Sequence, residues 1–110
     1  MKIFSYRLFF HALNNEGRLS IVELLKDDPR TVQDISKKLE MEQSLVSHNL
    51  KCLVNCGFVN VQKQGNFRVY SLDNQSVAPI LNSIDEHIEK FERRLKSCGI
   101  INPKVALAKA

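Results

Sequence analysis

The sequence contains no tryptophan, only four glycines and three prolines, and no apolar run that approaches the length of a membrane span. A transmembrane helix needs about 18 uninterrupted apolar residues. The N-terminal segment also lacks the long apolar region and the small-residue cleavage site of a signal peptide. Linkers, low-complexity segments and internal repeats are missing as well. We therefore expect a single-domain cytoplasmic protein with no membrane contact.

Cysteine is scarce too, and occurs only at positions 52, 56 and 98. An odd number of thiols in a reducing cytoplasm argues against a disulfide framework. Three interpretations stay open: burial as small apolar side chains, a reactive thiol, or a metal site. An enzyme is not expected, because a hydrolase needs a nucleophile next to a base and an orienting group. The scattered cysteines and histidines form no such set.

The 110-residue chain carries a net charge of +4. A domain of this length buries only a modest core, so long apolar stripes near both of its ends favour dimerisation. The positive charge doubles in a homodimer, which favours a polyanionic partner.

Apolar periodicity and capping signals predict four helices in the first half of the chain. The first covers residues 3–13 and ends at Asn14-Asn15, which suit a break and a new N-cap. The second stops at Asp27-Asp28-Pro29. Thr31 and Asp34 read as a capping box for a short third helix. A tight turn at 40–42 then leads to a fourth helix over 43–56, which Gly57 ends.

The second half of the sequence is predicted to form a hairpin and one long helix. Residues 59–62 and 67–72 alternate at period two around Gln64-Gly65-Asn66, as in a β-hairpin. An apolar residue recurs every three or four positions over 77–95. The third and fourth helices then form a helix-turn-helix, with the hairpin as its wing. We predict a mostly α winged helix-turn-helix fold with a β-hairpin wing over residues 1–98, a homodimer through its N- and C-terminal helices, and a mobile C-terminal tail over 99–110.

The fourth helix carries three strips of side chains, given about 100° of rotation per residue. The apolar seam that packs inward consists of Val46, Leu50, Leu53 and Gly57. The opposite, polar side consists of Ser44, Ser47, His48, Lys51 and Asn55. The flank between them consists of Leu45, Asn49, Cys52 and Cys56. Both sulfurs are therefore expected side by side, next to the polar side but not on it.

We predict that the polar side of this helix binds DNA. The N-terminal half of the second helix of a helix-turn-helix is where bases are read. The predicted DNA-binding residues of this side are Ser44, Ser47, His48 and Lys51. Arg68 of the hairpin is predicted to contact the flanking backbone. Lys63 lies in the same region of the chain, but phosphate contact is favoured for Lys51 and Arg68.

With this order of elements, the segments SLVSHNLKCLVNCGFV and GNFRVYSL make the chain resemble the ArsR/SmtB family of winged-helix, metal-responsive repressors. The resemblance covers roughly residues 5–98 and implies a repressor of transcription. A homodimer with two such helices would bind a pseudo-palindromic operator in double-stranded DNA. The family usually has histidine at the position of Asn49, so the sequence departs from the pattern on the strip that holds the cysteines.

The resemblance also implies where an inducer would bind. The cysteine pair of the arsenic and cadmium sensors would fall within residues 31–40, which contain no cysteine. The zinc site of the C-terminal helix is half present: Asp85 and His87 match, but Cys98 and Ile101 occupy the other positions. The cysteines at 52, 56 and 98 have nearly the spacing of the CmtR-type cadmium and lead sensors. In those proteins the third cysteine comes from the partner subunit.

Helix geometry favours a metal over a Cys52–Cys56 disulfide. Side chains one turn apart have Cβ atoms about 5–6 Å from each other, whereas a disulfide needs about 3.5–4.5 Å. A metal with bonds of about 2.3 Å to each sulfur can bridge the turn. Thiolates favour soft ions such as Cu(I), Zn(II) or, by resemblance, Cd(II) and Pb(II). An iron–sulfur cluster is less favoured, because it usually takes four thiolates and one subunit offers three.

The sequence thus predicts a DNA-binding transcriptional regulator whose DNA affinity falls when a soft metal ion binds Cys52, Cys56 and Cys98. Two alternatives stay open. The same thiols could respond to an oxidant or hold an iron–sulfur cluster, or the fold could be a docking and dimerisation module without DNA binding. The polar side of the 43–56 helix argues against docking, which would call for large apolar or aromatic side chains there. Asp85 and His87 are expected to be flank or interface residues rather than metal ligands.

Overall fold

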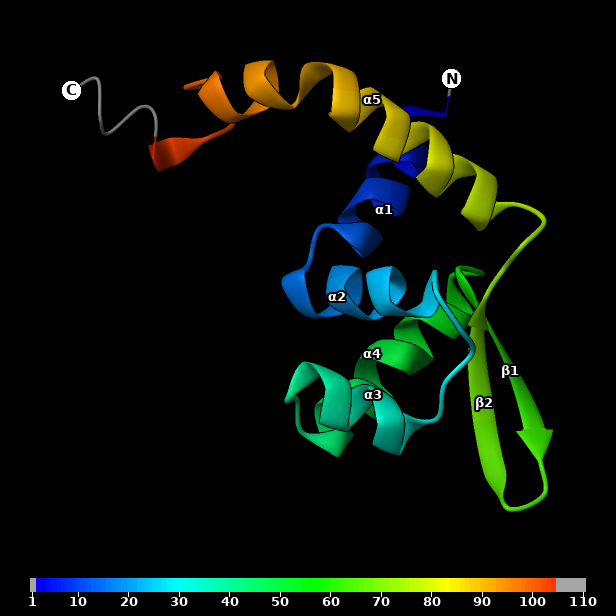
Figure 1. Ribbon diagram of the computed structural model, residues 1–110. Helices are drawn as coiled ribbons and strands as arrows, with labels where there is room; N and C mark the ends of the chain where they lie inside the picture. The colour runs from blue at the N-terminus through cyan, green and yellow to red at the C-terminus, as the bar shows by residue number, and fades with distance from the viewer. Residues whose placement is uncertain (1, 105–110) are drawn as a thin grey trace. The chain divides into compact units, whose positions relative to one another are not determined.

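The computed structural model describes residues 2–104 (Figure 1). The chain divides after Val77 into two compact units. We describe each unit by itself. The first contains α1 (Ile3–Leu13), α2 (Glu16–Leu25), α3 (Val32–Leu39), α4 (Gln43–Asn55), β1 (Val59–Gln64) and β2 (Phe67–Leu72). The second consists mainly of α5 (Val77–Ser97), which begins at the last residue of the first unit. No helix within residues 2–104 is long and apolar enough to span a membrane.

The helix ends follow the capping signals in the sequence. The side chain of Asn15 accepts a hydrogen bond from the Arg18 amide (2.9 Å) and begins α2. Thr31 Oγ1 accepts one from the Asp34 amide (3.2 Å) and begins α3. Gly57, with φ +82°, follows α4 in the left-handed conformation that glycine adopts without steric cost. The predicted N-caps and the terminating glycine are therefore confirmed.

The core of the first unit lies between α2, α3, α4 and the base of the hairpin. The apolar seam of α4 forms its centre, since Val46, Leu50 and Leu53 are all 0% exposed. The side chains that pack around this seam are Ile21, Val22, Leu25, Ile35, Phe58 and Val59. Full burial of the seam fixes the rotation of α4 about its axis, so its polar side must face outward.

The wing is an antiparallel hairpin whose tip pairs Gln64 with Phe67. Gly65 has φ +62° at the first position of the two-residue turn, as a type II′ turn requires. The hairpin is fixed to the helices by two backbone hydrogen bonds between Arg30 and Tyr70 (2.9 and 2.8 Å). The Arg30 guanidinium in turn pairs with the Asp34 carboxylate of α3 (2.7 Å). This chain of contacts fixes the wing relative to the helix-turn-helix.

Arg18 of α2 holds the C-terminal end of α1. Its guanidinium donates to the carbonyls of Ala12 and His11, the latter at 3.2 Å. Both carbonyls lie in the last turn of α1, and that of His11 also accepts from the Asn14 amide (3.2 Å). The charged donor therefore adds to the capping of this helix end. We expect Arg18→Met to lower the free energy of unfolding by about 1.5–3 kcal/mol, the usual range for hydrogen bonds to charged groups. Urea denaturation at fixed protein concentration measures this. Lys37→Met, at an exposed site on α3, is the control and should change stability by less than about 0.5 kcal/mol.

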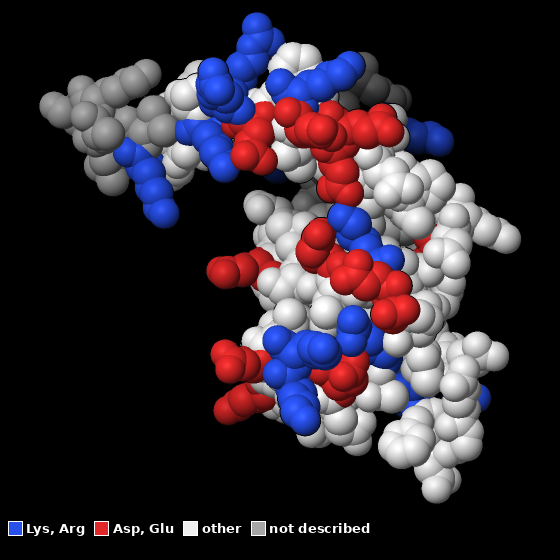
Figure 2. Space-filling model, in the orientation of Figure 1, with Lys and Arg blue, Asp and Glu red and all other residues white. Residues whose placement is uncertain are grey.

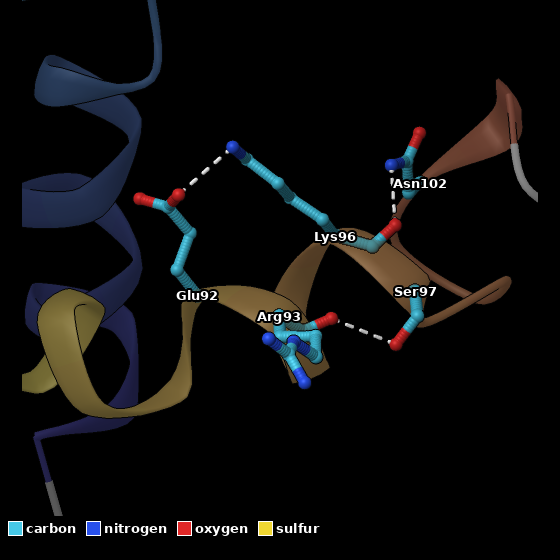
Figure 3. Close-up of polar contacts among 5 residues, drawn as sticks. All are labelled: Glu92, Arg93, Lys96, Ser97 and Asn102. Carbon is cyan, nitrogen blue, oxygen red and sulfur yellow. Dashed lines mark hydrogen bonds and ion pairs between the residues drawn. The ribbon is translucent and has the colours of Figure 1, made fainter.

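The second unit exposes one apolar face of α5. Ile80, Ile88 and Leu95 are 39%, 36% and 38% exposed. A shallow hollow of about 390 Å³ lies on the same helix, lined by Pro79, Ile80, Ser83, Ile84 and His87. Beyond α5 the chain turns back on the helix end through hydrogen bonds made by Asn102 (Figure 3). The predicted mobile tail over 99–110 is described only as far as residue 104, and its remainder lies outside the described residues.

Candidate nucleic-acid interface and thiol pair

The polar side of α4 is exposed as the sequence predicts. Ser44, Ser47, His48 and Lys51 are all exposed, while the seam behind them is fully buried. Ser44 and Ser47 lie in the first turns of the helix, and His48 and Lys51 follow near its middle. Hydroxyl, imidazole and ammonium groups of this kind can bind base edges and phosphates. The helix therefore presents a row of exposed hydrogen-bonding groups, for which residues 2–104 supply no partner.

A groove of about 680 Å³ lies between α4 and the wing. Its lining residues are Ser47, Lys51, Val54, Asn55, Val61, Lys63, Arg68 and Tyr70. Lys63 and Arg68 are direct cross-strand partners, and such like-charged pairs destabilise a hairpin. Lys51 adds a third cation from the helix, and no carboxylate occurs among the described residues that line the groove. A bound polyanion would offset the repulsion among the three cations, so the groove suits a phosphate backbone.

The charge elsewhere on the first unit is mixed. On the face shown in Figure 2, Lys and Arg side chains alternate with Asp and Glu over α2 and α3, and the visible face of the wing is largely uncharged. The lining of the groove differs because its charged residues are cations alone. Lys63, for which the sequence did not favour phosphate contact, faces the same groove as Lys51 and Arg68. Only the strand register reveals that placement.

Asn49 lies deeper than its position on the flank of the helix suggests. It is only 4% exposed, and its amide lies at the start of α2. A Cβ added to Gly17 would lie 2.9 Å from Asn49 Nδ2, which is closer than real side chains approach. The departure from the family's usual histidine thus falls at a packing site between α2 and α4. Sequence reasoning missed the role of Gly17, because a close approach between two helices leaves no local signal.

Cys52 and Cys56 lie together on the flank of α4, Cys52 half-buried and Cys56 exposed. Partial desolvation raises the pKa of the Cys56 thiol, and the charge and hydrogen bonding of Cys52 raise it further. The nearby Arg18 guanidinium lowers the same pKa to a smaller extent. The two sulfurs are thus close enough to interact, as the spacing predicts. A metal that binds Cys56 must displace a proton held more firmly than in an ordinary thiol.

Cys98 belongs to the second unit, where it is half-buried just beyond α5. Within residues 2–104, no three His, Cys, Asp or Glu side chains gather into a group that could hold a metal ion. The described part of one chain therefore does not complete a three-ligand site. The ring of His87 lies against that of Phe91 in a tilted arrangement, with centroids 4.7 Å apart.

Comparisons with known proteins agree with the helix-turn-helix fold. Residues 15–61, which include the helix-turn-helix, match the family model described as bacterial regulatory protein, arsR family. The transcriptional regulator NmtR of Mycobacterium tuberculosis is 40% identical over 78 residues, 71% of this chain and 65% of NmtR. A probable mercury resistance operon repressor of Streptomyces lividans is 32% identical over 66% of this chain and 58% of its own length. The chain thus spans a little under two thirds of each of these two relatives.

Solved structures extend the similarity beyond the helix-turn-helix. The solution structure of apo-NmtR aligns with a TM-score of 0.68 and 36% identity, over 78% of this chain and 72% of that one. The homodimeric winged helix-turn-helix DNA-binding domain of a possible ArsR-family regulator of Mycobacterium bovis aligns with a TM-score of 0.65 and 27% identity, over 74% and 78%. The capped helix-turn-helix, the hairpin wing and these alignments together establish that the chain belongs to the arsR family of bacterial regulatory proteins.

Proposed function

We propose that this protein is a homodimeric transcriptional regulator, acting as a repressor in the cytoplasm, that binds a pseudo-palindromic operator in double-stranded DNA. In this proposal a soft metal ion of the Cd, Pb or Zn type lowers its DNA affinity by binding Cys52, Cys56 and Cys98 of the partner subunit. The observation that carries DNA binding is the groove between α4 and the wing, in which Lys51, Lys63 and Arg68 converge without a carboxylate.

The polar side of α4 and the groove would contact different parts of the DNA. An α-helix fits the major groove, where each base pair presents a distinct pattern of donors and acceptors. Ser44, Ser47 and His48 at the exposed start of α4 would read those base edges. Lys51, which lines the groove beside the wing, would bind the adjacent phosphates together with Arg68. Phosphate contacts position the helix, and base contacts supply the specificity.

Dimerisation is supported by apolar surface that one chain leaves uncovered. On α1, Phe4 is 72% and Phe10 57% exposed, and α5 adds its exposed apolar face. Exposed clusters of this kind mark association sites in small soluble proteins. The homodimeric state of the similar Mycobacterium bovis domain supports the same arrangement.

The metal part of the proposal is supported by the paired thiols on α4. Cys52 and Cys56 lie one turn apart and interact, and soft ions prefer such thiolate ligands. The mercury resistance repressor among the relatives supports a soft-metal signal. A third thiolate from Cys98 of the partner subunit would complete the ligand set. Because the sulfurs are on the flank of the helix that reads DNA, their movement toward a metal would tilt that helix.

Substitutions on α4 test the DNA part of the proposal. We expect Lys51→Ala to weaken binding to every duplex. It should reduce the slope of log affinity against log salt by about 2, because the homodimer carries two copies of Lys51. Ser47→Ala or His48→Ala should instead change the preference between sequences, with about 1–3 kcal/mol lost for the preferred site. Fluorescence anisotropy with labelled duplexes at several salt concentrations measures both effects.

Lys90→Ala provides a charge-matched control on α5 and should leave the salt slope unchanged. If Lys51→Ala and Lys90→Ala behave alike, the groove does not bind phosphate. If the parent protein binds no promoter-region duplex at any salt concentration, the docking module is the better description of this fold.

A further inference from the structure

The backbone of Cys98 is held at both of its polar groups. Its amide donates to the Leu95 carbonyl (3.4 Å) in the last turn of α5, and its carbonyl accepts from the Asn102 amide (2.9 Å). The residues between them therefore form a closed turn that starts at the helix end. Ile100 and Ile101, at the outside of this turn, are 95% and 62% exposed, so contacts of these two side chains do not close it.

The side chain of Asn102 supplies the other bonds of this turn (Figure 3). Asn102 Nδ2 donates to the Lys96 carbonyl (2.7 Å), and Asn102 Oδ1 accepts from the Lys104 amide (3.2 Å). The Lys96 carbonyl is one of the last four of the helix, which have no intrahelical donor. One residue thus joins the end of α5, the carbonyl of Cys98 and the chain beyond the turn.

We propose that Asn102 is the positioning residue for the Cys98 thiol. By closing the turn 98–102 onto the end of α5, it holds the third thiolate of the proposed metal site in one place before the metal arrives. A ligand fixed in advance loses less conformational freedom on binding, which raises affinity without any new contact. This inference rests on the proposed function, in which Cys98 binds the metal held by Cys52 and Cys56 of the partner subunit.

Asn102→Asp is the sharpest test because it changes one atom of the contact. Aspartate keeps the shape and the acceptor for the Lys104 amide but cannot donate to the Lys96 carbonyl. It also places a negative charge at the negative end of the α5 dipole. We expect the Cd(II) dissociation constant, measured anaerobically by thiolate-to-metal absorption against a competing chelator, to rise roughly 3- to 10-fold. Helix content and the DNA affinity of the metal-free protein should not change.

Glu92→Gln is the matched control at the same helix end. It removes the ion pair between Glu92 and Lys96 (2.9 Å, Figure 3) and leaves the turn intact. Cd(II) affinity should therefore equal that of the parent. Equal losses of affinity in Glu92→Gln and Asn102→Asp would overturn the inference, because they would report general loosening of the helix end.

Cys98→Ser distinguishes a failure of the positioning role of Asn102 from a failure of the proposed metal site. If it weakens Cd(II) binding, and Asn102→Asp then has no additional effect in that background, Asn102 acts through the thiol as proposed. If Cys98→Ser weakens binding but Asn102→Asp alone binds like the parent, the inference fails and the proposed function stands. If Cys98→Ser binds Cd(II) like the parent, the proposed ligand set is wrong and the positioning role falls with it.

Discussion

The double variant Ile84→Asp, Ile88→Asp is expected to be monomeric and to bind an operator duplex about 1,000-fold more weakly than the parent chain. Ile88 belongs to the exposed apolar face of α5, and Ile84 lines the shallow hollow on the same helix. A carboxylate in a dimer seam would lose its hydration without gaining a partner. In a dimer, binding of one α4 helix to its half-site raises the effective concentration of the second α4 helix at the other half-site. A monomer has no second helix and loses this increase in affinity.

Sedimentation velocity and fluorescence anisotropy measure the two effects separately. Asn82→Asp with Arg93→Gln makes the same change in net charge on the opposite side of α5, where both residues are exposed, and should remain dimeric. If the isoleucine variant remains a folded dimer with parental DNA affinity, the seam lies elsewhere. A circular dichroism spectrum of each variant distinguishes dissociation from unfolding.

Cadmium should lower operator affinity by about 5- to 150-fold, the range of a coupling of about 1–3 kcal/mol. Spectroscopic titration should show about one Cd(II) per subunit. Serine at position 52, 56 or 98 should weaken Cd(II) binding, reduce the absorption to that of the thiolates that remain, and remove the DNA release. The raised pKa of Cys56 predicts how Cd(II) affinity depends on pH. Because a raised pKa favours the protonated thiol, and metal binding must release that proton, Cd(II) affinity should increase as the pH rises through neutrality.

Controls separate a metal signal from an oxidant signal at the same thiols. With a chelator present, diamide should leave the DNA complex of the parent protein intact if a metal is the signal. Release by diamide but not by Cd(II), lost in the triple-serine variant, would replace the metal by an oxidant. Release of the triple-serine variant by Cd(II) would show that the inducer site lies elsewhere, with Asp85 and His87 as the next candidates.

The helices and the polar side of α4 could be predicted because their signals are local. Asn15 and Thr31 each cap the helix that follows within three residues, and a buried seam recurring every three or four residues fixes which side of α4 faces out. The hairpin was predicted for the same reason, although β1 runs to Gln64 and leaves only Gly65 and Asn66 in the turn. Alternation at period two identifies strands well but sets their ends poorly.

Features that depend on contacts between distant segments were not predictable. The bridge from Arg30 to Tyr70 joins residues forty positions apart, and it fixes the wing that places Lys63 opposite Lys51. The close approach of Gly17 and Asn49 likewise depends on how α2 packs against α4. Periodicity in the sequence predicts on which side of its own helix or strand a residue lies. It does not predict which sides of two different elements pack against each other.

Reciprocal linkage between Cd(II) and operator DNA tests most directly whether the thiol site controls the DNA-binding surface. The coupling free energy between the two ligands must be the same in both directions. The Cd(II) dissociation constant would be measured anaerobically for the free protein and for the protein saturated with operator duplex, with Asn82→Asp, Arg93→Gln as an unaffected reference. If α4 carries both sites, operator DNA should weaken Cd(II) binding by the same factor by which Cd(II) weakens operator binding. Equal Cd(II) affinity with and without operator would contradict the account, since the thiols would then have no influence on the DNA-binding surface.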